Sequence, residues 1–258
     1  MSDSDIILQT EGLTKFYGGV HALQNVNFEL KRGEHVAIMG DNGAGKSTFV
    51  RQITGVEQRS GGKIWFNGNE VHFKGPLDAR EAGIETVFQN LALADDLDVP
   101  SNLFLGREKI RFNLGPFSLL DYKTMRDATK AALVRTGVKI PNLSNPIRSM
   151  SGGQRQCVAI ARTATFESKL IIMDEPTAAL GVQETAQVEN IVKTLKSNGE
   201  PLIIISHNMR QVFDLADRIV VFRRGRMVAN LMKADTSGQD VVAYITGAKT
   251  GAEFADAA

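Results

Sequence analysis

Three short apolar segments constrain the fold of this 258-residue chain more than any other feature. They cover residues 35–39, 170–173 and 202–206, are rich in Ile and Val, and show little polar alternation. Strands that are buried on both faces of a parallel sheet have this pattern. A glycine-rich loop follows the first segment, two carboxylates follow the second, and His207 follows the third. Because ligands of open α/β sheets bind at the carboxyl ends of strands, we expect one site there.

The glycine-rich loop matches the pattern G-x-x-x-x-G-K-[ST] from Gly40 to Ser47, between an expected strand and an expected helix at 47–53. Small residues let successive backbone N–H groups turn inward around a phosphate, and the helix N-terminus adds partial positive charge. Lys46 is expected to reach the β- and γ-phosphates, and the Ser47 hydroxyl to bind Mg²⁺. The residues expected to surround the phosphates are Gly40, Asn42, Gly43, Ala44, Gly45, Lys46, Ser47 and Thr48.

Two carboxylates, Asp174 and Glu175, end the segment 170–173. An acidic pair in this position is often only a cap on a strand. With a phosphate loop in the same chain, the pair is better explained as a catalytic site. Asp174 is then expected to hold Mg²⁺ through water, and Glu175 to polarise the attacking water as a general base.

The remaining patterns predict the fold class. A hairpin is expected at 63–73 with a type I′ turn at Asn67-Gly68, and another at 219–229 that turns at Arg224-Gly225. Helices are expected at 120–136, from Ser151 to Ala164, and at 182–196. We therefore predict an α/β fold: a P-loop NTPase core whose mixed sheet has a parallel centre, an N-terminal antiparallel β subdomain and an inserted helical subdomain.

The expected domain is single and spans residues 1–247. Its catalytic core covers about 1–89 and 167–247, the helical subdomain covers about 90–166, and residues 248–258 form a flexible tail.

The composition excludes several classes of protein. A hydrophobic content of 43%, a charged content of 23% and a formal charge of +1 fit a soluble protein and give no attraction to nucleic acid. The single cysteine, Cys157, cannot form an internal disulfide. No segment is long and apolar enough to cross a bilayer, and the acidic N-terminus lacks a signal-peptide pattern. We expect an intracellular protein that acts at a membrane only through a partner.

A second motif, Ser151-Gly152-Gly153-Gln154, lies upstream of the acidic pair. With the phosphate loop, it makes almost the whole chain similar to the nucleotide-binding subunit of an ATP-binding cassette (ABC) transporter. The resemblance implies ATP hydrolysis with Mg²⁺. It also implies a homodimer in which the signature of one subunit caps the γ-phosphate held by the loop of the other. A serine hydroxyl, bare backbone amides and a helix N-terminus all favour an anion.

Other positions also match the family. Gln89 resembles the glutamine that senses Mg²⁺ and contacts the membrane partner, although a solvated loop amide is the alternative. His207 resembles the histidine that contacts the γ-phosphate and orients the catalytic glutamate. Tyr17 resembles the aromatic residue that stacks on adenine, although a tyrosine near a hairpin is often part of a core. Gly181 departs from the family, because most members have an aspartate there that contacts the partner subunit. Either the backbone makes that contact in this chain, or communication between the two sites is weaker.

The segments around 179–185 and 205–225 resemble the monosaccharide (ribose- or fructose-type) importers of the family. This resemblance implies integral permease subunits that dock near residues 89–107, although local packing is an equal explanation of the apolar residues in that segment. It also implies an indirect role for a periplasmic sugar-binding protein, and a position on the inner face of the cell membrane. Two alternatives remain: an ABC ATPase for another cargo, and a soluble, non-transport ABC ATPase that acts on ribosomes or DNA.

Overall fold

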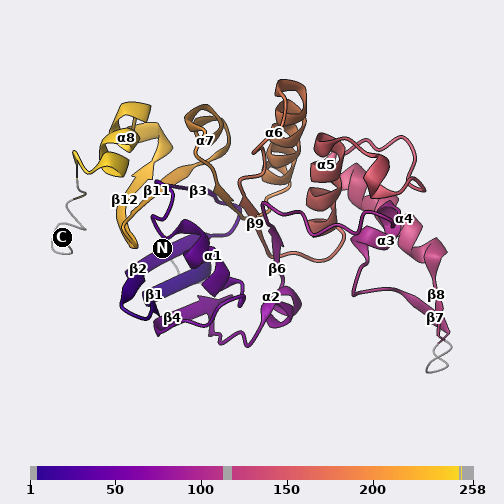
Figure 1. Ribbon diagram of the computed structural model, residues 1–258, viewed down its shortest axis with the longest axis horizontal. Coiled ribbons are helices and arrows are strands. Elements are labelled where there is room, and N and C mark those ends of the chain that lie inside the picture. The colour runs from indigo at the N-terminus through magenta and orange to yellow at the C-terminus, as the bar shows by residue number, and fades with distance from the viewer. Residues whose placement is uncertain (1–4, 113–117, 250, 252–258) are drawn as a thin grey trace. The chain divides into compact units, whose positions relative to one another are not determined.

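The computed structural model describes residues 5–112, 118–249 and 251. The chain forms two compact units (Figure 1). The first unit comprises residues 1–86, 169–175 and 196–258, and the second comprises residues 87–168 and 176–195.

A six-stranded sheet has the order β12-β11-β3-β10-β9-β6. Strand β3 pairs in parallel with β10 and β11, β10 pairs in parallel with β9, and β12 is antiparallel to β11. The predicted mixed sheet with a parallel centre is therefore confirmed, and each of the three apolar segments is a strand to within one residue. The strands are β3 (His35–Met39), β6 (Ile84–Val87), β9 (Leu170–Asp174), β10 (Leu202–Ile205), β11 (Arg218–Arg223) and β12 (Arg226–Met232).

An antiparallel sheet of the first unit has the order β2-β1-β4-β5. The predicted turn at Asn67-Gly68 joins β4 to β5, and its φ angles of 51° and 77° are those of a type I′ turn. Strand β5 is shorter than the second strand of the hairpin predicted at 63–73. Its ladder with β4 includes only two residue pairs. The strands are β1 (Ile6–Tyr17), β2 (Val20–Lys31), β4 (Gly61–Phe66) and β5 (Asn69–Glu70).

An aromatic cluster joins the two sheets of the first unit through helix α1 (Lys46–Ile53). The ring of Phe49 lies 5.2 Å from that of Phe28 on β2 and 5.5 Å from that of Phe222 on β11. All three side chains are buried, so their packing fixes α1, and with it the phosphate loop, against both sheets. The unit also contains α2 (Pro76–Ala82), α7 (Met209–Leu215), α8 (Gly238–Thr246) and the 3₁₀ helix η4 (Lys233–Asp235).

The second unit is mainly helical, as predicted. Helix α4 begins after Asp121, whose side chain accepts the Thr124 N–H, and ends at Gly137, whose φ of 70° stops the helix. The helices are α3 (Val99–Leu103), α4 (Tyr122–Thr136), the 3₁₀ helix η3 (Ile147–Ser149), α5 (Gly152–Thr163) and most of α6 (Val182–Ser197). A two-stranded hairpin of β7 (Ile110–Phe112) and β8 (Leu119–Leu120) was not predicted, because strands of two or three residues leave no periodic signal.

The expected flexible tail, 248–258, falls largely outside the described residues. Within it, Lys249 forms an ion pair with Asp240 at 2.6 Å, and the Gly251 N–H donates to the Val228 carbonyl. Among the helices that the structure describes, none is both long and apolar enough to cross a bilayer.

Candidate active site

Gly40 begins the phosphate loop directly after β3, where the chain must turn across the neighbouring strand β11. Its φ is +146°, and a Cβ built there would lie 2.2 Å from the Phe222 carbonyl oxygen. Only glycine fits this position, because any side chain would overlap the backbone of β11.

The β11–β12 turn braces the phosphate loop. The Gly225 N–H donates to the Ala44 carbonyl at 2.9 Å, and a Cβ on Gly45 would lie 3.2 Å from the Gly225 Cα. The sequence predicts this turn but not its contact with the loop, since about 180 residues separate the two. Gly225 is therefore a supporting residue of the site that motif spacing could not reveal.

The Lys46 ammonium lies inside the loop, where its Nζ donates to the carbonyl oxygens of Gly40 at 2.6 Å and Asp41 at 2.9 Å. Burial lowers the pKa of Lys46, and the negative charges of Glu175, Asp174 and Asp41 oppose that shift. The lysine and the two carboxylates that end β9 thus form one electrostatic cluster.

Asp174 and Glu175 lie close together with different environments. Burial, and then the charge of Glu175, raises the pKa of Asp174. Glu175 has a φ of +50°, which is unusual for a residue with a side chain, and its N–H donates to the Ile205 carbonyl at 3.0 Å. This bond to β10 holds the strained residue, and its side chain is only 17% exposed.

His207, which follows β10, lies with its Nδ1 2.9 Å from the Glu175 carboxylate. The side chain is 76% exposed, so it is not a core histidine. One imidazole nitrogen therefore fixes the carboxylate, and the exposed ring is available to a ligand. A carboxylate that is oriented by a neighbouring imidazole in this way can act as a general base.

Tyr17 ends β1 and is 43% exposed, so it is not part of the core. Its hydroxyl bonds to Glu57, and the Lys15 ammonium lies 5.1 Å from its ring centroid. Burial and Glu57 raise the pKa of Tyr17, and the charge of Arg51 on α1 opposes this shift.

The donor set at the start of α1 suits Mg²⁺. The Ser47 hydroxyl is in the first turn of α1, and Asp174 supplies a carboxylate whose pKa is already raised by burial and by a like charge. A divalent cation would relieve this repulsion, and oxygen ligands are those that Mg²⁺ prefers. Among the described residues, no group of three or more His, Cys, Asp or Glu side chains is arranged so that it could hold a metal ion.

The signature motif forms the N-terminus of α5 in the second unit. Ser151 is the N-cap: its side chain accepts the Gln154 N–H at 3.2 Å, and the Gln154 side chain accepts the Ser151 N–H at 3.0 Å. This capping box stabilises the helix by about 1 kcal/mol. Ser151 and Gly152 are exposed, whereas Gly153 is buried. The N-terminus of α5 therefore presents an exposed serine and an exposed glycine.

Gln89 also belongs to the second unit, two residues after β6. Gln89 is exposed in the loop that follows this strand. An exposed amide after a strand fits both of the interpretations left open above.

Glu184 places a carboxylate next to Gly181, the position at which this chain lacks the usual aspartate. Its Oε2 accepts the Gly181 N–H at 2.8 Å, and a Cβ on Gly181 would lie 2.7 Å from that oxygen. An aspartate at 181 would place its side chain against Glu184. Glycine at 181 therefore leaves the space that the Glu184 carboxylate occupies. The Glu184 carboxylate lies beside position 181, where most of the family has an aspartate.

We expect Gly153→Ala to lower the stability of the second unit by about 1–3 kcal/mol, the usual cost of overpacking. A Cβ there would lie 2.3 Å from Cγ and 2.7 Å from Cβ of Glu184. Gly152→Ala is the matched control, because its Cβ would meet only Leu180 at 3.8 Å. Urea unfolding of both variants measures the difference. Equal stabilities would contradict this packing of α5 against α6.

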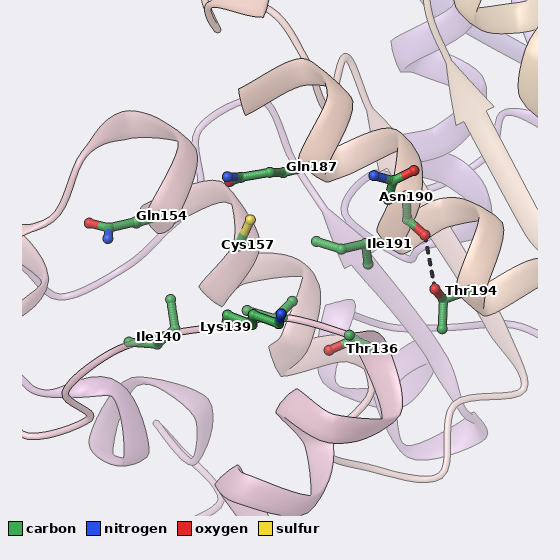
Figure 2. Close-up of a pocket in the computed structure, with 11 residues that line it drawn as sticks. Thr136, Lys139, Ile140, Gln154, Cys157, Gln187, Asn190, Ile191 and Thr194 are labelled. Atoms are coloured by element: carbon green, nitrogen blue, oxygen red, sulfur yellow. Dashed lines mark hydrogen bonds between the residues drawn. The ribbon is translucent and has the colours of Figure 1, made fainter. Parts of the chain in front are cut away.

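A pocket of about 300 Å³ lies between α5, α6 and the chain that follows α4 (Figure 2). Cys157 of α5 lines it beside Gln154, and burial raises the pKa of the Cys157 thiol to about 11. The thiol is therefore protonated and unreactive at neutral pH. The residues of α6 in the pocket are Gln187, Asn190, Ile191 and Thr194.

A strand, a glycine loop closed around a lysine, a helix, and an acidic pair on a second parallel strand define a phosphate-loop nucleoside triphosphatase. The comparison with known families is more specific. Residues 23–178 match the ABC transporter family. The chain belongs to this family and is one of its nucleotide-binding ATPases.

Curated relatives include two of similar length. The chain is 45% identical to the fructose import ATP-binding protein FrcA of Rhizobium meliloti, over 94% of this chain and 95% of the relative. It is 40% identical to the xylose/arabinose import ATP-binding protein XylG of Sulfolobus acidocaldarius, over 97% of both chains. Other relatives are about twice as long: the chain covers 48% of FruK of Bifidobacterium longum, with 35% identity.

Solved structures agree on the fold. A structure of cbiO1 from Clostridium perfringens is 30% identical with a TM-score of 0.77, over 95% of this chain and 96% of that chain. The ATP-binding cassette MJ1267 is 27% identical with a TM-score of 0.80, over 93% of this chain and 98% of that chain. The predicted fold class is confirmed.

Proposed function

We propose that this chain is the energy-coupling ATPase of an ABC importer for a monosaccharide. The observation that carries the proposal is the 45% identity to a fructose import ATP-binding protein over nearly the whole of both chains. The second relative of equal length is named for xylose and arabinose import. Within the chain, the Glu175–His207 pair supports hydrolysis.

The proposed chemistry is water attack on the γ-phosphate of ATP. Lys46 and the loop amides bind the phosphates, Glu175 accepts the proton of the attacking water, and His207 orients Glu175 and contacts the γ-phosphate. Ser47, Asp174 and Gln89 would hold Mg²⁺, which neutralises phosphate charge when it is bound. Tyr17 stacks on the adenine, with Lys15 against its ring.

The proposed assembly is a homodimer that binds ATP between its subunits. The loop of one subunit holds the phosphates, and Ser151, Gly152, Gly153 and Gln154 of the other cap them. The exposed hydroxyl and N-terminus of α5 suit an anion. Two equivalent sites follow from the two-fold symmetry.

We propose that permease subunits dock at residues 89–107 and hold the chain at the inner face of the cell membrane, with a periplasmic sugar-binding protein acting indirectly. In this scheme the helical subdomain covers about 90–166, and the catalytic core covers about 1–89 and 167–247. Leu97 is 37% exposed and Leu105 is 41% exposed, so this segment offers apolar contacts.

We expect purified Glu175→Gln protein to shift from monomer to dimer on addition of ATP and Mg²⁺, because bound ATP persists and joins the subunits. Light scattering measures the shift. In the double variant Glu175→Gln/Ser151→Arg, a guanidinium replaces the capping hydroxyl, and we expect a monomer under the same conditions. A dimer that forms equally well without nucleotide, or despite Ser151→Arg, would contradict the shared site.

The cargo is tested by uptake of radiolabelled substrates into cells that lack this gene. Wild-type chain, but not Glu175→Gln, is expected to restore uptake of a monosaccharide. Restored uptake of an amino acid or lipid instead would favour the alternative of another cargo. Unchanged uptake of every substrate, with ATPase activity bound to ribosomes or DNA, would favour a non-transport ATPase.

A further inference from the structure

The position of the His207 ring depends on the backbone that carries it. The side chain is 76% exposed, so packing constrains the ring little, and yet its Nδ1 lies 2.9 Å from the Glu175 carboxylate. An exposed imidazole keeps such a contact only where the chain on either side of it is held. The two residues that flank His207, Ser206 and Asn208, both belong to one hydrogen-bond network.

The Ser206 hydroxyl is the centre of this network. It donates to Oε1 of Gln211 at 2.9 Å and accepts the Asn208 N–H at 3.1 Å. The Gln211 N–H donates to the side-chain oxygen of Asn208 at 3.2 Å, which caps α7. Ser206 and Gln211 are buried, and a buried polar group that loses its partner is costly, so the network resists distortion. It therefore fixes the turn that carries His207 between β10 and α7.

Ser206 also follows directly on the residue that holds the backbone of Glu175. The Ile205 carbonyl accepts the Glu175 N–H at 3.0 Å. The end of β10 therefore holds Glu175 at two points, with Ile205 at its backbone and His207 at its carboxylate. Ser206 lies between these two points, and all of these residues belong to the first unit. A base that is fixed in this way stays aligned with the water that it activates.

We propose that Ser206 and Gln211 are positioning residues for ATP hydrolysis and that they act through His207. The inference rests on the proposed function, in which Glu175 accepts the proton of the attacking water and His207 orients Glu175. Without the Ser206 hydroxyl, the Asn208 N–H and the Gln211 amide oxygen lose their shared partner. The turn then loosens, and the imidazole no longer holds the carboxylate. Nucleotide affinity comes chiefly from the phosphate loop, so turnover changes while binding stays nearly constant.

The test is steady-state ATP hydrolysis by the full chain, with binding of a fluorescent ATP analogue and urea unfolding measured on the same preparations. Ser206→Ala removes the hydroxyl, and Gln211→Met removes the acceptor of that hydroxyl at a similar side-chain size. Both variants keep the Asn208 cap of α7. We expect each to lower kcat by roughly 10- to 100-fold with an unchanged Kd, because a displacement of about 1 Å in an active site costs up to about 100-fold.

Combination with His207→Ala separates positioning from a general loss of structure. Once the imidazole is absent, the network has no ring to align. The double variant Ser206→Ala/His207→Ala should therefore hydrolyse ATP at the rate of His207→Ala alone. Ser237→Ala is the matched control, because Ser237 is also a serine of the first unit whose hydroxyl accepts a backbone N–H, at the start of α8. It should lower stability without changing kcat.

Three results would overturn the proposal. These are wild-type kcat in both Ser206→Ala and Gln211→Met, additive losses in the double variant with His207→Ala, or an equal loss of kcat in Ser237→Ala. If His207→Ala slows turnover and the two network variants do not, the network has no positioning role and the proposed function stands. A wild-type rate in His207→Ala would overturn the role of that histidine in the proposed function, and the positioning role with it.

Discussion

Glu175→Gln is expected to slow ATP turnover by roughly 10²–10⁴-fold, about 3–5.5 kcal/mol of barrier, while ATP still binds. The amide keeps the size of the side chain but cannot accept a proton from water. The Glu175 backbone is held by its bond to Ile205, so the substitution should not move the loop. Phosphate release and binding of a fluorescent nucleotide measure the two effects separately.

Glu70→Gln is the matched control for this experiment. Glu70 is a surface carboxylate of the same unit, on β5, and its side chain is 43% exposed. Its amide variant should hydrolyse ATP at the wild-type rate. His207→Ala should also slow turnover, because it releases the Glu175 carboxylate from its 2.9 Å contact. Wild-type turnover in Glu175→Gln would exclude Glu175 as the base.

Acid is expected to destabilise the fold through His35. This first residue of β3 is fully buried, and burial lowers its pKa to about 4. Its Nε2 bonds to the Glu200 carbonyl at 3.0 Å, and its Nδ1 has no partner among the described residues. Burial of the charged ring outweighs the backbone carbonyls of Glu200 and Leu215, which favour protonation, so the pKa is lowered. The nearby Lys196 also opposes protonation, while Asp217 favours it.

The direction of the pH effect follows from this lowered pKa. Above pH ~6.5, His35 is neutral in both states and contributes no pH dependence. As the pH falls from ~6.5 to ~4, the unfolded chain binds the proton first, so the free energy of unfolding decreases, by about 3 kcal/mol in all.

Urea unfolding at neutral and acid pH measures this loss. We expect His35→Gln to lack most of the pH dependence, even if the variant is less stable at neutral pH. His72→Gln is the control, because His72 is exposed, and it should keep the wild-type pH dependence. An equally steep loss of stability in His35→Gln would show that other groups cause it.

Local patterns predicted much of the fold. Strands β3, β9 and β10 agree with the apolar segments because both faces of a central strand are buried, which selects continuous apolar sequence. The turn at Asn67-Gly68 was predictable since few other residue pairs tolerate two positive φ angles. Ser151 marked the start of a helix for the same kind of local reason.

Long-range contacts were not predictable. Gly225 against Ala44, and His35 against Glu200, join residues that are far apart in the chain. The sequence showed that Gly181 lacks the carboxylate usual in the family, but only the structure placed the Glu184 carboxylate at its N–H. The hairpin strands of the second unit were too short to give a pattern.

The sequence by itself determined the chemistry of this protein, because phosphate binding, proton acceptance and helix capping each demand particular residues at short spacing: Gly40 to Ser47, Asp174-Glu175, and Ser151 to Gln154. The tertiary structure decided which residues support that chemistry and which surface remains exposed. Neighbours such as Phe222 at Gly40 and Glu184 at Gly153 depend on packing between distant segments. Such packing is set by the whole chain, so no short motif encodes it.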